Sequence, residues 1–130
     1  MSHDAHDAPP TDADLTLATQ VRTHLRACAA DTLPLTYKAL AKALDLQPPH
    51  TIHRVTTALE CLMREDVAAG VPMIAALVTS RWRGGLPAPG FFALAHTLGR
   101  HDGEAEGAAA EAFHRREFDA ALAYWVKAAR

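Results

Sequence analysis

Residues 35–59 read LTYKALAKALDLQPPHTIHRVTTAL, and their pattern is the most informative about the fold. Thr36 is a good helix N-cap, and apolar residues then recur at the spacing of one helix face. Pro48 and Pro49 follow, and because proline cannot continue a helix they predict a turn. A second helical pattern begins near His50 or Thr51. The stretch therefore predicts two helices joined by a tight turn.

The second of these two helices has distinct faces, and Gly70 is expected to end it. The face predicted to be buried consists of Ile52, Val55, Leu59, Leu62 and Met63. The face predicted to point outward consists of His53, Arg54, Thr57, Glu60 and Arg64.

A strand and a hairpin are expected next. Residues 73–78, MIAALV, form a short apolar run bounded by Gly and Pro, which predicts a buried strand. Residues 81–90, RWRGGLPAPG, are turn-forming throughout. Phe91 and Phe92 then begin either a returning strand or a short helix reaching Leu98. Two helices followed by a strand and a hairpin are the pattern of a winged helix-turn-helix.

Further helices flank this unit. One is expected from Thr11 or Asp12 to about Ala30, and another from about residue 103 to the C-terminus. The predicted fold class is mainly α with a small β-hairpin, a winged helix-turn-helix between N- and C-terminal helices. We expect residues 11–130 to form a single winged-helix-like domain after a disordered acidic tail, residues 1–10. The last helix has an apolar seam that either packs on the first helix or forms a homodimer: Phe118, Leu122 and Trp125.

Charge is unevenly distributed along the 130 residues, whose net charge is −2. Residues 1–16 contain four aspartates and no Lys or Arg, whereas residues 36–100 contain seven basic and four acidic residues. A net negative chain argues against a strongly electrostatic nucleic-acid binder. The basic surplus lies where the fold would place a DNA-binding face.

Several other classes have little support. There is no apolar run of about 20 residues to span a membrane, and no signal-peptide pattern, so we expect a cytoplasmic protein. Cys28 and Cys61 match no metal or redox spacing. His50 and His53 lack a third metal ligand, and no nucleophile motif occurs. We therefore expect no cofactor, no metal and no catalysis.

The likeness to known proteins begins with residues 36–41, Thr-Tyr-Lys-Ala-Leu-Ala, and continues with residues 53–58, His-Arg-Val-Thr-Thr-Ala. With these motifs, residues 35–92 resemble the C-terminal winged-helix domain of the O6-alkylguanine-DNA alkyltransferase and alkyltransferase-like family. That family has Thr-Tyr-Gly-x-Leu-Ala and Arg-Ala-Val-Gly-x-Ala at these places. The resemblance implies the scaffold and contact with double-stranded DNA.

The chemistry of the family does not carry over. Its Pro-Cys-His-Arg-Val-Val motif corresponds to Ile-Ala-Ala-Leu-Val at residues 74–78, so the acceptor cysteine and the tryptophan that replaces it are both absent. The base-displacing arginine of the family falls on His53, with Arg54 one position away. Alkyl transfer is thereby excluded.

We therefore predict a small non-catalytic DNA-binding protein, with a regulatory role as one option. The recognition helix and the wing supply the polar and cationic contacts to phosphates and bases. The candidate DNA-binding residues are Lys38, Lys42, Thr51, His53, Arg54, Thr57, Arg64, Arg81 and Arg83. The alternative is a protein-interaction module on the same scaffold. A small enzyme would require a pocket in which groups such as Tyr37 and His53 converge.

Overall fold

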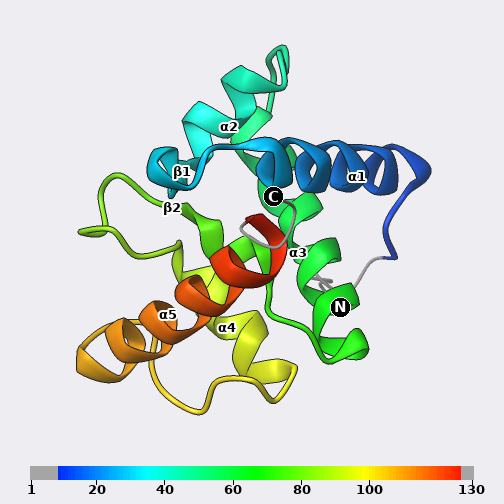
Figure 1. The fold of residues 1–130 in the computed structure, drawn as a ribbon. Coiled ribbons are helices and arrows are strands. Elements are labelled where there is room, and N and C mark those ends of the chain that lie inside the picture. The colour runs from blue at the N-terminus through cyan, green and yellow to red at the C-terminus, as the bar shows by residue number, and fades with distance from the viewer. Residues whose placement is uncertain (1–8, 127–130) are drawn as a thin grey trace.

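The computed structural model describes residues 9–126 and is mainly helical, with one small sheet, as the sequence predicts (Figure 1). Its elements in chain order are α1 (Asp12–Ala27), the 3₁₀ helix η2 (Ala30–Thr32), β1 (Leu35–Thr36), α2 (Tyr37–Ala43), α3 (Thr51–Ala69), the 3₁₀ helix η3 (Ile74–Leu77), β2 (Val78–Thr79), α4 (Pro89–Thr97), α5 (Ala108–Ala121) and the π-helix η4 (Leu122–Val126).

The predicted helix boundaries are largely confirmed because they depend on local chemistry. Thr11 caps α1 in a capping box with Asp14, each side chain accepting the other's backbone N–H. The Thr36 hydroxyl accepts the N–H of Ala39 at the start of α2. Gly70 ends α3 with φ of 71°, a left-handed conformation that favours glycine.

The core forms where α1 lies across α3 (Figure 1). Val21 and Leu25 of α1 are fully buried, as is Val55 of α3. The seam residues of the last helix also pack against this core: Phe118, Leu122 and Trp125. Packing of the C-terminal helix on α1 is therefore confirmed, and a homodimer through the same residues stays a prediction.

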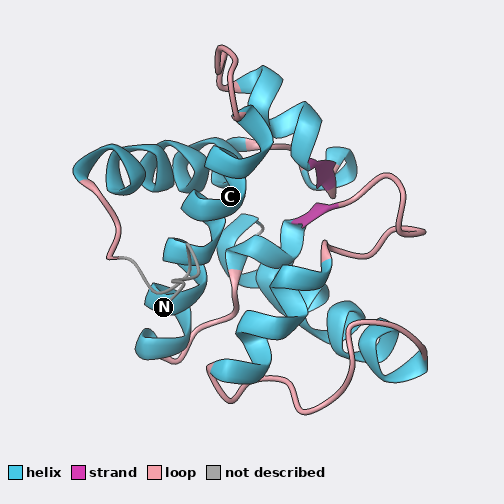
Figure 2. Ribbon diagram, turned by 180° about the vertical axis from the view of Figure 1, so that it is seen from behind, coloured by secondary structure: helices cyan, strands magenta, loops and turns pink. Residues whose placement is uncertain are grey.

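The predicted wing hairpin is wrong. Ile74–Leu77 form a 3₁₀ helix, and only Val78 and Thr79 are extended. These two residues pair in parallel with Leu35 and Thr36 (Figure 2), so the sheet joins segments on either side of α2 and α3. Parallel pairing needs such a crossover and cannot form within a hairpin.

The second arm of the expected hairpin is helical instead. Phe91 and Phe92 lie in α4, which is one of the two alternatives that the sequence left open. Pro89 occupies the first position of this helix, where its missing N–H costs nothing and its fixed φ favours the helix.

Two assignments on α3 were also wrong. Ile52 was predicted to be buried, but it is 43% exposed because the first turn of α3 extends beyond the core. Glu60 was predicted to face outward, but it is only 6% exposed because α4 packs on this part of the helix. The six residues Ala58–Met63 are all buried, so this part of α3 has no solvent-facing side.

The connector between α3 and β2, residues 71–77, is held by buried carboxylates. Glu117 Oε2 of α5 accepts the N–H of Met73 at 2.8 Å. Asp66 Oδ2 of α3 accepts the N–H of Ile74 at 2.9 Å. Buried backbone N–H groups need such partners, because an unsatisfied one costs about 1–3 kcal/mol.

Each of these carboxylates is paired with an arginine. Arg100 Nη1 lies 3.0 Å from Glu117 Oε2 and also donates to the carbonyl of Val71 at 2.9 Å. Arg22 Nη2 of α1 lies 2.9 Å from Asp66 Oδ1. Two ion pairs thus tie the connector to α1, α3 and the loop after α4.

Two side-chain rings also form hydrogen bonds with carbonyl groups of the connector. Trp125 Nε1 donates to the carbonyl of Pro72 at 2.7 Å. His114 Nε2 lies 3.0 Å from the carbonyl of Ala76, where it acts as donor when the ring is neutral. Burial lowers the pKa of His114 from its ordinary value, partly offset by this hydrogen bond.

The Glu117 interaction predicts a large effect on stability. Glu117→Ala should lower the free energy of unfolding by about 3 kcal/mol, because it leaves the Met73 N–H and the Arg100 guanidinium unsatisfied. Glu111→Ala, on the exposed face of the same helix, should change it by less than about 0.5 kcal/mol. Urea denaturation followed by circular dichroism measures both, and equal losses would contradict the role of Glu117.

His114 predicts a pH dependence of stability. Its pKa is lower in the folded state than the unfolded value of about 6.5, so the unfolded chain binds the proton more tightly. The stabilisation is complete above about pH 6.5 and is lost as the pH falls from there through the folded pKa. His114→Gln should flatten the fall in unfolding free energy over this interval; an unchanged pH profile would contradict the assignment.

Candidate functional site

The end of the molecule formed by α2, the turn and the first turn of α3 is well defined. Arg54 Nη1 donates to the carbonyl of Gln47 at 3.2 Å, and the Gln47 amide donates to Asp45 Oδ1 at 3.2 Å. Asp45 and His50 both adopt positive φ, of 56° and 63°. These contacts fold the proline turn back against α3.

The N-terminus of α3 is exposed. His50 occupies the N-cap in a left-handed conformation and provides no side-chain cap. Ile52, His53 and Arg54 are exposed, and Thr51 is half-buried. The N–H groups of a first helical turn have no partner within the helix and bear the positive end of the helix dipole. This end of α3 therefore favours an anionic ligand.

Exposed cations occur on both helices that flank the turn. Lys38 and Lys42 are exposed on α2, which has no acidic residue, and Arg54 is exposed on α3. Residues 36–54 contain these three cations and a single carboxylate, that of Asp45. We call this surface the α2–α3 tip: Lys38, Lys42, Thr51, His53 and Arg54.

The predicted wing residues lie on the loop between β2 and α4 and have different roles. The Arg83 guanidinium makes hydrogen bonds within the chain. It donates to the carbonyls of Pro87 at 3.1 Å and Ala105 at 2.6 Å. Arg81 is exposed and stacks on the Trp82 ring at 5.1 Å, with Trp82 itself 86% exposed. The loop is therefore organised by Arg83, while Arg81 points to solvent-accessible space.

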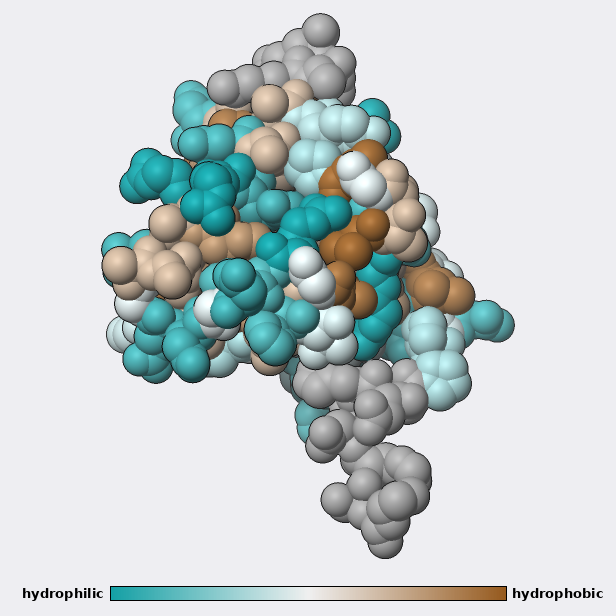
Figure 3. Space-filling view, turned by 90° about the horizontal axis from the view of Figure 1, so that it is seen from below, coloured by the Kyte–Doolittle hydropathy of each residue, from teal (hydrophilic) through white to brown (hydrophobic). Residues whose placement is uncertain are grey.

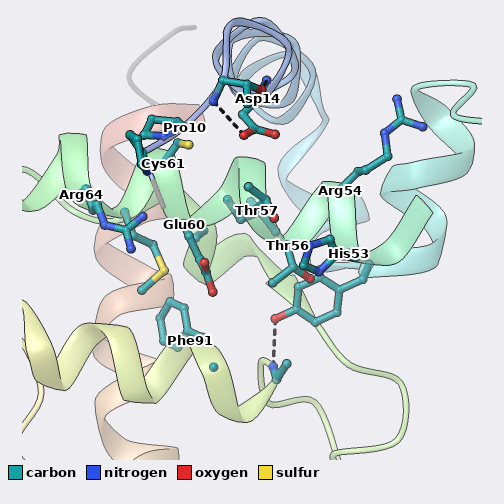
Figure 4. Close-up of a pocket in the computed structure, with 18 residues that line it drawn as sticks. Pro10, Asp14, His53, Arg54, Thr56, Thr57, Glu60, Cys61, Arg64 and Phe91 are labelled. Carbon is teal, nitrogen blue, oxygen red and sulfur yellow. Dashed lines mark hydrogen bonds between the residues drawn. The ribbon is translucent and has the colours of Figure 1, made fainter. Parts of the chain in front are cut away.

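Thr57 and Arg64, the remaining candidates, line a pocket, which His53 and Arg54 of the tip also border. This cavity of about 460 Å³ lies between α3, the start of α4 and residues 9–14. Figure 4 shows Glu60 directed from α3 toward Phe91 on α4, with Arg54 pointing away on the other side. Sequence reasoning missed Glu60 as a pocket residue. An isolated carboxylate inside the apolar run Ala58–Met63 was the available signal.

Two ionisable groups of the pocket, Tyr37 and Cys61, are shifted toward their neutral forms. Burial raises the pKa of the Tyr37 phenol, although its oxygen accepts the N–H of Ala88 at 2.8 Å and Arg83 lowers the pKa; the charge of Glu60 raises it further. Burial also raises the pKa of the Cys61 thiol, with the charge of Asp14 as the next cause. Both groups are neutral at pH 7.

Hydrophobic exposure is scattered over the described residues. The large apolar side chains that are exposed lie on four separate elements: Leu15, Ile52, Trp82 and Tyr124. Seen from below, hydrophobic residues form a small area among hydrophilic ones (Figure 3). Within residues 9–126 no helix is long and apolar enough to cross a membrane, and no group of three His, Cys, Asp or Glu side chains could hold a metal ion.

Comparison of the chain with protein-family models, with curated proteins and with solved structures finds no significant match.

Proposed function

We propose that the protein binds double-stranded DNA, without catalysis, through the α2–α3 tip. The observation that carries this proposal is the exposed first turn of α3, which has no side-chain cap and carries Arg54, together with the exposed cations Lys38 and Lys42 on α2 before the turn. Backbone N–H groups at a helix start and nearby cations are the groups that contact DNA phosphates. In DNA-binding helix-turn-helix proteins, the helix after the turn contacts base edges through its N-terminal residues.

The residues of the tip divide into those that contact phosphates and those that contact base edges. Lys38 and Lys42 contact phosphates, which fixes the orientation of α3 on the duplex. Thr51 and His53 offer donors to base edges, and Arg54 can pair with guanine through its guanidinium. The bond from Arg54 to Gln47 O uses one nitrogen, so other donors of the guanidinium remain for DNA.

The other candidate residues make smaller contributions. Arg81 reaches a phosphate from the β2–α4 loop, whereas Arg83 acts by keeping that loop in place. Thr57 and Arg64 lie further along α3, beside the pocket. Access to DNA agrees with the expected cytoplasmic location.

Binding should be weak and salt-sensitive. Three neutralised phosphates give a slope of about 3 for log Kd against log salt concentration. The chain as a whole carries a net charge of −2, which opposes long-range attraction. Non-specific contacts of this kind are typically in the micromolar range or weaker, with Kd of about 10⁻⁶ to 10⁻⁴ M.

The test is a fluorescence-anisotropy titration of a random-sequence duplex at about 50 and about 150 mM salt. Lys42→Ala/Arg54→Ala should raise Kd roughly tenfold or more at the lower salt and reduce the salt slope by about 1, for the lost phosphate contact of Lys42. Arg115→Ala/Arg116→Ala removes the same charge from the exposed face of α5 and is the matched control. Equal effects of the two double variants would contradict a site at the tip.

A protein-interaction module is the second candidate. The observation that favours it is Trp82, which is 86% exposed beside the Arg81 cation. Tryptophan and arginine are the residues most often found at the centre of protein interfaces. If the protein bound no duplex at either salt concentration, the protein-interaction function would be favoured over DNA binding.

A further inference from the structure

The loop between β2 and α4, residues 80–88, has a defined shape although it contains neither helix nor strand. The N–H of Ser80 donates to the carbonyl of Leu86 at 2.8 Å, which closes the base of the loop. The N–H of Arg83 donates to the carbonyl of Ser80 at 3.2 Å, and the Arg83 guanidinium donates to two further carbonyls. These hydrogen bonds stabilise one conformation of the loop.

The β2–α4 loop is also fixed relative to α2. At the end of the loop, the N–H of Ala88 donates to the hydroxyl of Tyr37, the first residue of α2, at 2.8 Å. At its start, β2 pairs with β1, which leads directly into α2. Figures 1 and 2 show the loop extending outward beyond β2. It is therefore tied to the helix that carries Lys38 and Lys42 of the α2–α3 tip.

This fixed loop presents a tryptophan to solvent. Trp82 is 86% exposed, whereas tryptophan side chains are highly buried on average. The Arg81 guanidinium lies over the ring, 5.1 Å from its centroid, which is within the range of a cation–π contact. With Arg81 on one face, the exposed indole offers its other face for stacking and has a positive charge beside it.

The charge around Trp82 favours an anionic partner. Residues 67–101 contain three arginines and no Asp or Glu. Glu106, from the segment before α5, lies 3.9 Å from Arg83, while Arg81 is exposed beside the ring. A nucleic-acid strand supplies an aromatic base for the ring and a phosphate for the cation. An apolar protein surface would match the ring but would desolvate Arg81 without pairing its charge.

We propose that Trp82 stacks on an unpaired base of DNA, with Arg81 at the adjoining phosphate. This proposal rests on the proposed function, in which the α2–α3 tip binds the neighbouring duplex, and it names the preferred ligand as a duplex that continues into a single strand. A paired base must first be unstacked to reach Trp82, a cost that an unpaired base does not carry. Every base has a flat aromatic face, so stacking here is tolerant of sequence.

The test compares three DNAs by fluorescence anisotropy at about 50 mM salt. They are a random-sequence duplex, the same duplex with a single-stranded tail of about five thymidines, and the same duplex with an abasic tail of equal length. The abasic tail has the phosphates but no bases, so it separates stacking from charge. The thymidine tail should bind at least about fivefold more tightly than the abasic tail. Equal Kd values for the two tails would overturn the proposal.

Three variants assign the preference to the ring. Trp82→Ala should abolish the difference between the two tails without changing the melting temperature or the Kd for the plain duplex, because the side chain is exposed. Trp82→Phe should keep most of the difference, since it retains an aromatic face. Tyr124→Ala removes another exposed aromatic side chain, from η4, and is the matched control that should keep it all. A tail preference that survives in Trp82→Ala, or is lost equally in Tyr124→Ala, would contradict the role of Trp82.

Tryptophan fluorescence gives an independent readout. The chain has two tryptophans, and the second, Trp125, is hydrogen-bonded to the carbonyl of Pro72 within the fold. A base stacked on an indole quenches its emission. The thymidine-tailed DNA should therefore quench the parent chain more than the Trp82→Ala protein, and equal quenching of the two would count against stacking.

Failure of this proposal is distinguishable from failure of duplex binding. Lys42→Ala/Arg54→Ala should weaken binding of all three DNAs but keep the ratio between the two tails, whereas Trp82→Ala should do the reverse. Duplex binding without a tail preference would overturn the stacking proposal alone and leave Trp82 to the protein-interaction function. A tail preference without binding of the plain duplex would overturn the α2–α3 tip alone, and binding of none of the DNAs would overturn both.

Discussion

The structure depends on how the buried connector, residues 71–77, satisfies its backbone. This segment contains one short 3₁₀ helix, which leaves the N–H groups of Met73 and Ile74 without backbone partners, and it is largely buried from water. Side chains replace water here: Glu117 and Asp66 accept its N–H groups, and Arg100 donates to its first carbonyl. Because these side chains come from distant parts of the sequence, the connector fixes the relative positions of nearly all the helices.

The same connector shows what sequence patterns can and cannot predict. Helix starts and stops at Thr11, Thr36 and Gly70 were predictable because each depends on a few neighbouring residues. A short apolar run such as Ile74–Leu77 is ambiguous between strand and helix. Its conformation is decided by partners such as Glu117, which lie far along the chain and are invisible to local patterns.

The candidate site divides in the same way. Residues before and just after the proline turn, such as Lys42 and Arg54, were predicted together, and the structure places them at one end of the molecule. Thr57 and Arg64 share a helix face with His53, but the packing of α4 on the middle of α3 turns that face into a pocket wall. Glu60 was missed because its burial comes from an element about 30 residues away in sequence, whose position depends on tertiary packing.

The parallel pair of β1 and β2 has a consequence for modularity. Leu35 lies just before α2, yet its strand partner is Val78, which follows α3. During synthesis the entry to α2 therefore has no sheet partner until the chain beyond α3 has emerged. The connector before Val78 in turn lacks the acceptor of its Met73 N–H until Glu117 of α5 has been synthesised. The orientation of α2 and α3 thus depends on contacts with segments outside them. Moved alone into another protein, these two helices would lose the contacts that set this orientation.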